Sequence, residues 1–117
     1  MDRKKELKEL YKQMKPDMGI FIVRNSENNK YHLRTTQNLK GIINSTKFQL
    51  NAGNYVNKEL QKEWHEYGAS KFTIEILEIL EYDKDESKTD YTEELEIMKV
   101  VWEEKLLQKN MTEYREK

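Results

Sequence analysis

The sequence contains no cysteine, one proline and two histidines among its 117 residues. Without cysteine there can be no disulfide framework, no thiolate nucleophile and no cysteine-ligated zinc. No stretch approaches the roughly 18 apolar residues that a membrane-spanning helix needs. The basic start of the chain is not followed by the apolar run of a signal peptide or anchor. We therefore expect a cytoplasmic protein that has no membrane partner.

Charged residues are abundant, since they make up 37% of the chain, with 21 basic and 22 acidic side chains. The two signs are distributed unevenly. Residues 1–71 carry fourteen basic and eight acidic side chains, whereas residues 72–117 carry seven and fourteen. The basic part could face phosphate groups, or the two parts could neutralise each other across the fold, because sequence charge does not say which face the charges occupy.

The first expected elements are a helix and a β-hairpin. Helical spacing of apolar residues predicts an amphipathic helix over residues 1–15, which Pro16 would end. Its apolar positions are Leu7, Leu10, Tyr11 and Met14. Residues 20–23 and 31–35 are β-branched and aromatic runs joined by an asparagine-rich turn, which is typical of a hairpin.

Two helices and a third strand should follow. Helical periodicity returns at Asn38 and should end at Gly53. The next helix should be capped by Asn57 and end at Gly68. Residues 71–80 alternate and then become uniformly apolar, which predicts a strand whose far end is more deeply buried. The helical residues expected to be buried are Leu39, Ile42, Ile43, Thr46, Leu50, Leu60, Trp64 and Tyr67.

The last part of the chain should form an acidic loop over residues 81–91, an amphipathic helix, and a frayed tail over residues 108–117. The apolar stripe of that helix contains Tyr91, Leu95, Met98, Trp102 and Leu106. Its wet face contains Glu93, Glu94, Glu96, Glu103 and Glu104. Together these elements predict an α+β fold with a small three-stranded antiparallel sheet flanked by helices.

No familiar catalytic constellation is present. There is no Walker loop, no dinucleotide fingerprint and no HExxH motif. His65 has no convergent ligand or base partner among its helical neighbours, so we expect it at the surface. Trp64 and Trp102 lie on apolar stripes and are interpreted as core residues rather than base-stacking platforms.

A series of short motifs nevertheless occurs in a recognisable order. Gly19-Ile20-Phe21 begins a strand, and Thr36-Gln37-Asn38-Leu39 follows the hairpin. The later matches are Gly53, Asn57, Leu60-Gln61, Trp64, Tyr67-Gly68, Phe72 and Leu77-Glu78. In order and spacing, these residues resemble the GIY-YIG nuclease superfamily, which includes intron homing endonucleases and incision nucleases of excision repair. The resemblance covers residues 18–107 and implies a GIY-YIG endonuclease-like fold there.

The resemblance also implies a site in which two tyrosines, an arginine and histidines surround the scissile phosphate. Phe21 stands at the first tyrosine and Ile42 at the arginine. The second tyrosine falls on His32, with Arg34 at the motif glycine, or on Tyr31 if one residue is inserted before Asn38. A one-residue slip moves a strand residue to the other face of the sheet, so both registers stay open.

The rest of the implied site is also substituted. Thr46 and Tyr55 stand where the family has histidines, Tyr55 just before the pattern asparagine Asn57. Lys99 stands where a glutamate of the family binds one divalent metal ion, and Glu96 one turn away could replace it. The positions equivalent to the family site are therefore Phe21, His32, Arg34, Ile42, Thr46, Tyr55, Asn57 and Lys99.

Three hypotheses follow. The first is a catalytically inactive GIY-YIG-like domain that binds DNA or RNA through phosphate contacts of its basic first part. The candidate contacts are Arg24, Lys30, Arg34, Lys40 and Lys47. The second is a protein-interaction or structural module that keeps only the fold. The third is an active endonuclease with a rearranged site that uses Glu96 with His32 or Tyr31. Only the third requires a cofactor, Mg²⁺.

Overall fold

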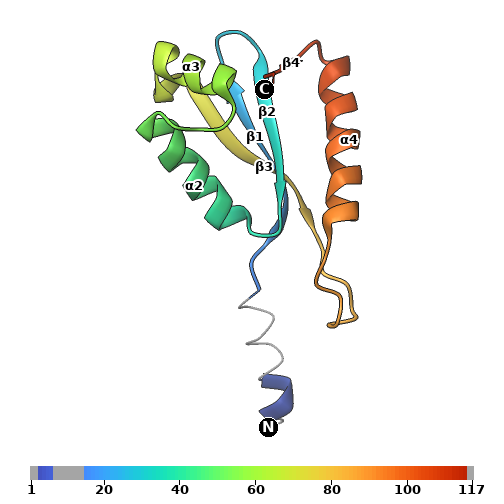
Figure 1. The fold of residues 1–117 in the computed structure, drawn as a ribbon. Coiled ribbons are helices and arrows are strands. Elements are labelled where there is room, and N and C mark those ends of the chain that lie inside the picture. Colours follow the sequence, from blue (N-terminus) through green and yellow to red (C-terminus); the bar gives the residue numbers. More distant parts are fainter. Residues whose placement is uncertain (1–2, 7–14, 116–117) are drawn as a thin grey trace.

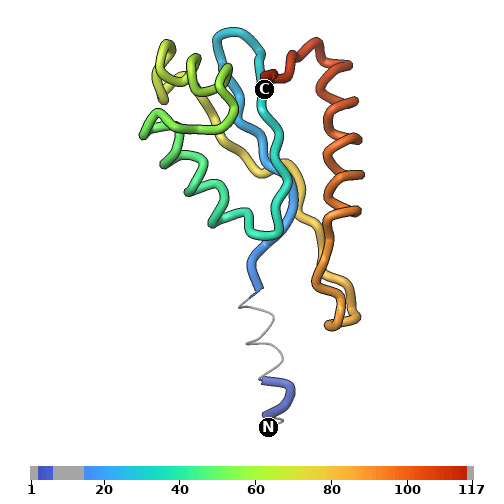
Figure 2. The backbone as a smooth tube through the Cα atoms, viewed as in Figure 1, coloured from blue at the N-terminus to red at the C-terminus, as the bar shows by residue number. Residues whose placement is uncertain are grey.

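The computed structural model describes residues 3–6 and 15–115 of the chain. Residues 3–6 are helical. The four apolar positions of the predicted N-terminal helix, Leu7, Leu10, Tyr11 and Met14, lie outside the described residues. From residue 18 onward the elements are β1 (Met18–Asn25), β2 (Lys30–Thr36), α2 (Leu39–Ala52), α3 (Lys58–Tyr67), the short 3₁₀ helix η1 (Ala69–Lys71), β3 (Phe72–Leu80), α4 (Thr92–Gln108) and β4 (Thr112–Glu113). Figures 1 and 2 show how they are arranged.

The sheet has four strands in the order β3-β1-β2-β4. The β1–β2 and β1–β3 pairs are antiparallel, but β4 runs parallel to β2 and pairs with Lys30 and Tyr31. The prediction of a three-stranded antiparallel sheet was therefore wrong in strand number and in direction. A two-residue strand has no alternation of its own, so hydrophobic periodicity cannot reveal it.

The additional strand comes from the segment that was expected to fray. The backbone N–H of Tyr114 donates to the carbonyl of Tyr31 at 2.8 Å, and the Tyr114 side chain is only 1% exposed. Met111 is also buried. The prediction of a frayed tail over residues 108–117 was thus wrong for its described part, residues 108–115, because tertiary pairing with β2 supplies the backbone partners that the segment lacks locally.

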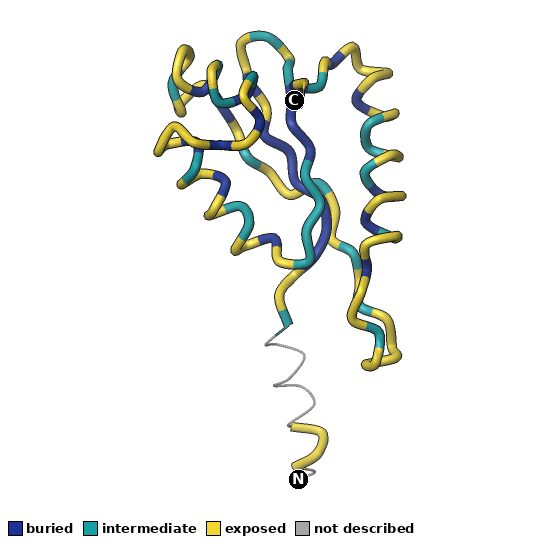
Figure 3. The backbone as a smooth tube through the Cα atoms, in the orientation of Figure 1, coloured by how far each residue is buried: buried dark blue, intermediate teal, exposed yellow. Residues whose placement is uncertain are grey.

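Helices cover both faces of the sheet, α2 and α3 one face and α4 the other (Figure 1). The alternation of β1 divides its side chains between the two layers. Phe21 and Val23 pack with residues of α2 and α3, whereas Ile20 and Ile22 pack with residues of α4. As a result β1 is buried along almost its whole length, as Figure 3 shows.

The structure confirms the predicted C-terminal end of α2 and the predicted N-terminal cap of α3. Gly53 follows α2 with φ 82°, in the left-handed region that closes a helix without a Cβ penalty. Asn57 caps α3 by accepting a hydrogen bond from the N–H of Leu60. Trp64 is buried as predicted, but Tyr67 at the end of α3 is exposed, which corrects its assignment to the buried stripe.

β3 is confirmed as a strand, but its expected burial is wrong. Its far end is not more deeply buried, since Ile79 is 51% exposed and Leu77 and Leu80 are only half-buried. The strand lies at one edge of the sheet, and α4 packs against β1 and β2 rather than over β3. Trp102 of α4 is half-buried against the core between α4 and the sheet, and its indole N–H donates to Glu78 of β3 at 2.9 Å. None of the described helices is long and apolar enough to cross a membrane.

Candidate functional site

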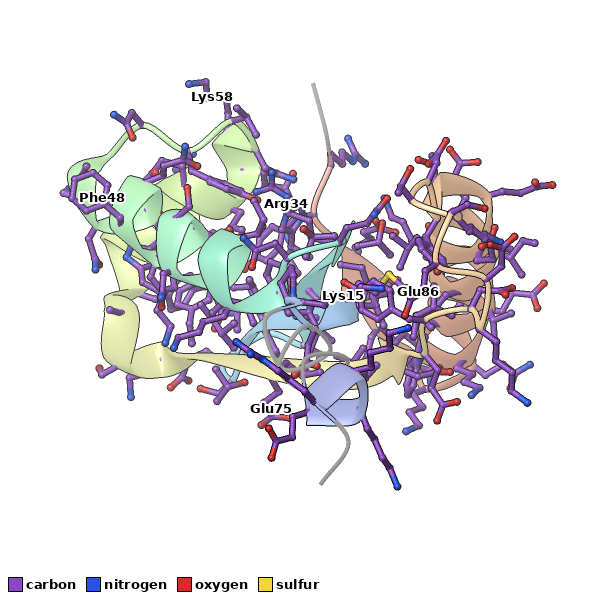
Figure 4. The ribbon with its side chains drawn as sticks, turned by 90° about the horizontal axis from the view of Figure 1, so that it is seen from below. Lys15, Arg34, Phe48, Lys58, Glu75 and Glu86 are labelled. Atoms are coloured by element: carbon purple, nitrogen blue, oxygen red, sulfur yellow. The ribbon has the colours of Figure 1, made fainter. Side chains whose placement is uncertain are left out.

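A small cavity of about 200 Å³ opens beside the free part of the β2 edge. β4 covers this edge at Lys30 and Tyr31, and from residue 32 onward no strand within residues 15–115 pairs with it. The cavity is lined by His32, Leu33, Arg34, Thr35, Tyr55, Val56 and Lys99. Arg34, labelled in Figure 4, lies between α2 and α4. The site therefore combines residues from β2, the α2–α3 loop and α4.

A chain of hydrogen bonds joins four polar side chains at this site. His32 Nε2 lies 2.8 Å from the Tyr55 hydroxyl. Arg34 Nη1 donates to that hydroxyl and to Thr46 Oγ1, each at 3.3 Å. Thr46 in turn donates to the carbonyl of Ile42 at 2.7 Å. His32, Thr46 and Tyr55 are buried, whereas Arg34 is half-buried. The Arg34 guanidinium therefore lies between the buried His32–Tyr55 pair and the cavity.

The His32–Tyr55 pair has one more donor than it can use. If the Tyr55 hydroxyl donates to Nε2, the proton of His32 is on Nδ1, which is buried and has no partner among the described residues. If instead Nε2 donates to Tyr55, the hydroxyl proton has no acceptor, because its other neighbour is the Arg34 guanidinium, which only donates. Either tautomer leaves one donor of this buried pair without an acceptor among the described residues.

His32 is neutral near pH 7. Burial, together with the positive charges of Arg34 and Lys99, lowers the pKa of its imidazole from 6.5 to about 4. The two cations therefore face a neutral ring. A pocket lined by two cations attracts an anion.

The sheet register places His32, and not Tyr31, at this cavity. Phe21 is opposite Arg34 and Val23 is opposite His32, so these side chains share the face covered by α2 and α3. Tyr31 points to the α4 face. Phe21 is fully buried in the α2–α3 layer and has no hydroxyl to offer.

The remaining expected positions have structural roles. Ile42 packs against the core beneath α2 and carries no charge. Asn57 is buried and caps α3, outside the cavity. Glu96 is exposed and does not line the cavity.

The residues present do not fit a magnesium ion. Mg²⁺ prefers carboxylate oxygens, but the helix position that lines the cavity is Lys99, whose ammonium would repel a divalent cation. No group of three histidine, aspartate or glutamate side chains that could hold a metal ion occurs in residues 3–6 and 15–115. The cavity accordingly offers binding groups for an anion and no ligand set for a metal.

The five basic candidates are not gathered on one surface. Arg34 alone lines the cavity. Arg24 lies on the opposite face, where its guanidinium contacts the Met111 sulfur at 3.4 Å. Lys30 forms ion pairs with Glu59 and Glu63, both at 3.2 Å. Lys40 and Lys47 are exposed on α2.

Sequence reasoning missed the second cation of the cavity. It named Lys99 only as the substitute for a metal ligand, and did not pair it with Arg34. The sequence did contain a signal. The resemblance places Lys99 at a metal-binding position and Arg34 at the motif glycine, so both substitutions add a positive charge at positions of the same implied site.

No protein-family model matches the sequence, and no curated protein matches it. Solved structures do match. The catalytic domain of the homing endonuclease I-TevI superposes with a TM-score of 0.64 and 21% identity, over 85% of this chain and 99% of that one. A mutant of the same intron endonuclease domain gives a TM-score of 0.63 and 22% identity, over 85% and 92%. The β1–β2 hairpin, the helices that follow it and the strand β3 thus form, with α4, the fold of a GIY-YIG endonuclease domain.

Proposed function

We propose that this domain binds nucleic acid without cleaving it, and that one backbone phosphate sits in the cavity between Arg34 and Lys99. The observation that carries the proposal is that both cations line one small cavity together with the neutral His32–Tyr55 pair. A phosphate oxygen accepts strong charge-assisted hydrogen bonds from a guanidinium, and a second cation adds to the attraction.

The same residues support binding rather than cleavage. Phe21 cannot relay a proton or hold a water, because it has no hydroxyl. His32, with a pKa near 4, is a weak base at neutral pH. Lys99 stands where a metal ligand would be needed, so developing negative charge in a transition state would meet no metal ion. We infer that the site holds a phosphodiester in its ground state and offers no route through hydrolysis.

Fluorescence anisotropy of labelled single- and double-stranded DNA and RNA, at about 50 and 200 mM salt, tests the proposal. We expect binding that weakens with salt and leaves the strand intact on a gel. Lys99→Gln should weaken binding severalfold and reduce the slope of log affinity against log salt by about one, because one phosphate contact is lost. Arg34→Gln should have a similar effect. Lys62→Gln, on the exposed side of α3, is the matched control and should leave binding unchanged.

Three outcomes would overturn the proposal. A cleaved product that disappears in Glu96→Ala would establish the active nuclease. Absence of binding at both salt concentrations would favour the protein-interaction module. Binding that is equally sensitive to Lys62→Gln and Lys99→Gln would show a diffuse electrostatic surface without a phosphate pocket.

The interaction module is the second candidate because α4 exposes several apolar side chains. Leu107 is 70% exposed, and Ile97, Val100 and Val101 are also exposed. Contiguous apolar surface of this kind is typical of interaction sites. Light scattering at increasing protein concentration, compared with an Ile97→Lys variant, would detect self-association through this helix.

A further inference from the structure

Two half-buried cations meet at the β2-edge cavity, the cavity of about 200 Å³ described above, without a counter-ion. Arg34 belongs to β2 and Lys99 to α4, and both side chains are half-buried. Neither of them forms an ion pair with a carboxylate of the described residues. Two like charges that face one cavity repel each other, and an anion between them removes this repulsion.

The charge of the lining distinguishes between kinds of phosphate. Arg34 and Lys99 contribute one positive charge each, and the lining contains no carboxylate among the described residues. The other lining residues are uncharged at pH 7: His32, Leu33, Thr35, Tyr55 and Val56. A phosphodiester within a strand carries a single negative charge, whereas a phosphate monoester at the end of a strand carries about −1.5 to −2. The terminal phosphate therefore balances both cations, and an internal phosphate leaves one of them uncompensated.

The size of the β2-edge cavity points in the same direction. Its volume of about 200 Å³ lies below the roughly 300 to 1,000 Å³ of small-molecule sites, so it suits a phosphate group better than a whole nucleotide. The two cations also approach from different elements, the strand β2 and the helix α4. A terminal phosphate has three free oxygens and only one ester arm that must leave the cavity. An internal phosphate has two free oxygens and two such arms.

An apolar side chain at this cavity favours a phosphate that carries an organic group. Val56 belongs to the lining, yet its side chain is 71% exposed. Inorganic phosphate gains nothing from such a surface. The sugar or base of the last nucleotide of a strand can contact it and remove apolar area from water.

We propose that the β2-edge cavity binds the terminal phosphate of a nucleic-acid strand in preference to an internal one. Nη1 of Arg34 already donates to Thr46 and Tyr55, so the other guanidinium nitrogens hold one phosphate oxygen. Lys99 holds a second oxygen, and the ester arm leaves past Val56. This inference rests on the proposed function and narrows it, because the domain then recognises the ends of strands.

Fluorescence anisotropy with the full chain tests the preference. Labelled strands of one sequence carry a 5′-phosphate, a 3′-phosphate or no terminal phosphate, and an unphosphorylated strand is lengthened until its total charge equals that of the phosphorylated ones. We expect at least one phosphorylated end to bind about fivefold more tightly than the charge-matched strand. Lys99→Gln should reduce this preference to less than about twofold, because one of the two cations is removed. Lys62→Gln, on the exposed side of α3, is the control and should keep the preference.

Two small phosphates separate the terminal group from the rest of the strand. In NMR titrations of the full chain, we expect methyl phosphate, a monoester, to shift the amides of Arg34, Val56 and Lys99 in a saturable manner. Dimethyl phosphate, a diester, should bind more weakly. Methyl phosphate should in turn bind more weakly than the phosphorylated strand, since it lacks the nucleoside. Equal affinity of methyl phosphate and the phosphorylated strand would instead identify a free phosphomonoester as the ligand and overturn the assignment to strand ends.

The remaining outcomes distinguish this inference from the proposed function. If phosphorylated and charge-matched strands bind equally well, and Lys99→Gln weakens both, the preference for ends is refuted while nucleic-acid binding stands. If no strand binds, both proposals fail. A preference that Lys62→Gln reduces as much as Lys99→Gln does would show that general charge, and not the cavity, selects the ligand, and it too would overturn the inference.

Discussion

Glu63 of α3 is expected to be the most sensitive polar residue of the fold, because four donors converge on its carboxylate. Oε1 accepts from Asn25 at 3.1 Å, Asn28 at 2.7 Å and the Tyr114 hydroxyl at 2.7 Å. Oε2 accepts from the Lys30 ammonium at 3.2 Å. The side chain is 12% exposed. One carboxylate thus fastens α3 to the β1–β2 hairpin and to the segment after β4.

Glu63→Ala should lower the free energy of unfolding by about 3 to 5 kcal/mol. Each of the three neutral hydrogen bonds contributes about 1 kcal/mol and the charged one somewhat more. Asn25 and Tyr114 are fully buried, so their donors cannot turn to water when the carboxylate is removed. The total corresponds to the loss of one partner from a buried charged network.

Urea denaturation followed by far-UV circular dichroism measures the effect, with Glu59→Ala as the matched control. Glu59 lies one turn before Glu63 and pairs with the same Lys30 ammonium at 3.2 Å, but it is 30% exposed and accepts no second side-chain hydrogen bond from the described residues. Its removal should cost about 1 kcal/mol or less. If the two variants differ in stability by less than about 0.5 kcal/mol, the convergence of donors on Glu63 does not stabilise the fold and the reasoning fails.

The same network gives a dependence on pH. Burial opposes ionisation of Glu63, but hydrogen bonds from Tyr114, Asn28 and Lys30 outweigh it and hold the pKa below its ordinary value of 4.5. A carboxylate with a lowered pKa in the folded state stabilises the protein above the unfolded pKa, and this contribution disappears as the pH falls through the folded pKa. The stability difference between the wild type and Glu63→Ala should therefore shrink below pH 4.5.

Three further predictions concern the backbone and His32. Gly19→Ala should lower the free energy of unfolding by about 2 to 3 kcal/mol in thermal melts, because a Cβ there would overlap the backbone carbonyl of Glu78, which cannot move aside. Gly53→Ala has open space but a left-handed φ, so it should cost only about 1 kcal/mol in the same measurement. Asn57→Ala should cost about 1 kcal/mol through loss of the α3 cap, whereas Asn57→Ser should restore most of it. The imidazole of His32 should stay neutral in NMR titrations down to a pH of about 4; because its pKa is lowered from 6.5, the unfolded state binds the proton first, so this residue should reduce stability as the pH falls from 6.5 towards 4. A His32 resonance that titrates near pH 6.5 would contradict this.

Much of the fold was predictable because local signals and tertiary packing agree. The helices α2, α3 and α4 each carry an apolar stripe, and Gly53 and Asn57 mark their ends by backbone geometry and capping. The hairpin was marked by its asparagine-rich turn, in which Asn29 has φ 58°. These features depend on residues a few positions apart, so a single sequence contains them.

The errors all concern contacts between distant residues. Whether Ile79 is buried depends on which strands α4 covers, and the alternation of β3 carries no information on that. The burial of Tyr114 depends on Glu63 and on the carbonyl of Tyr31, which are 51 and 83 positions away. The position of the family's second tyrosine also depends on a distant contact. Only the pairing of β2 with β1 decides that His32, rather than Tyr31, faces the cavity.

When a sequence is compared with a family one position at a time, a charge that is lost at one position and supplied from a different element nearby in space goes unnoticed. The resemblance places an arginine at Ile42 of α2, so the sequence predicts that its positive charge is lost. In the structure the guanidinium of Arg34 reaches from β2 to Thr46, one turn beyond Ile42 on the same helix. A cation is therefore present beside α2, but it comes from the strand β2 instead of from the helix, while Lys99 adds a second cation from α4. Under the proposed function, these two cations would hold a phosphate group while no metal ligand is present to help activate a water, so the proposal rests on the change in charge rather than on the loss of any single catalytic residue.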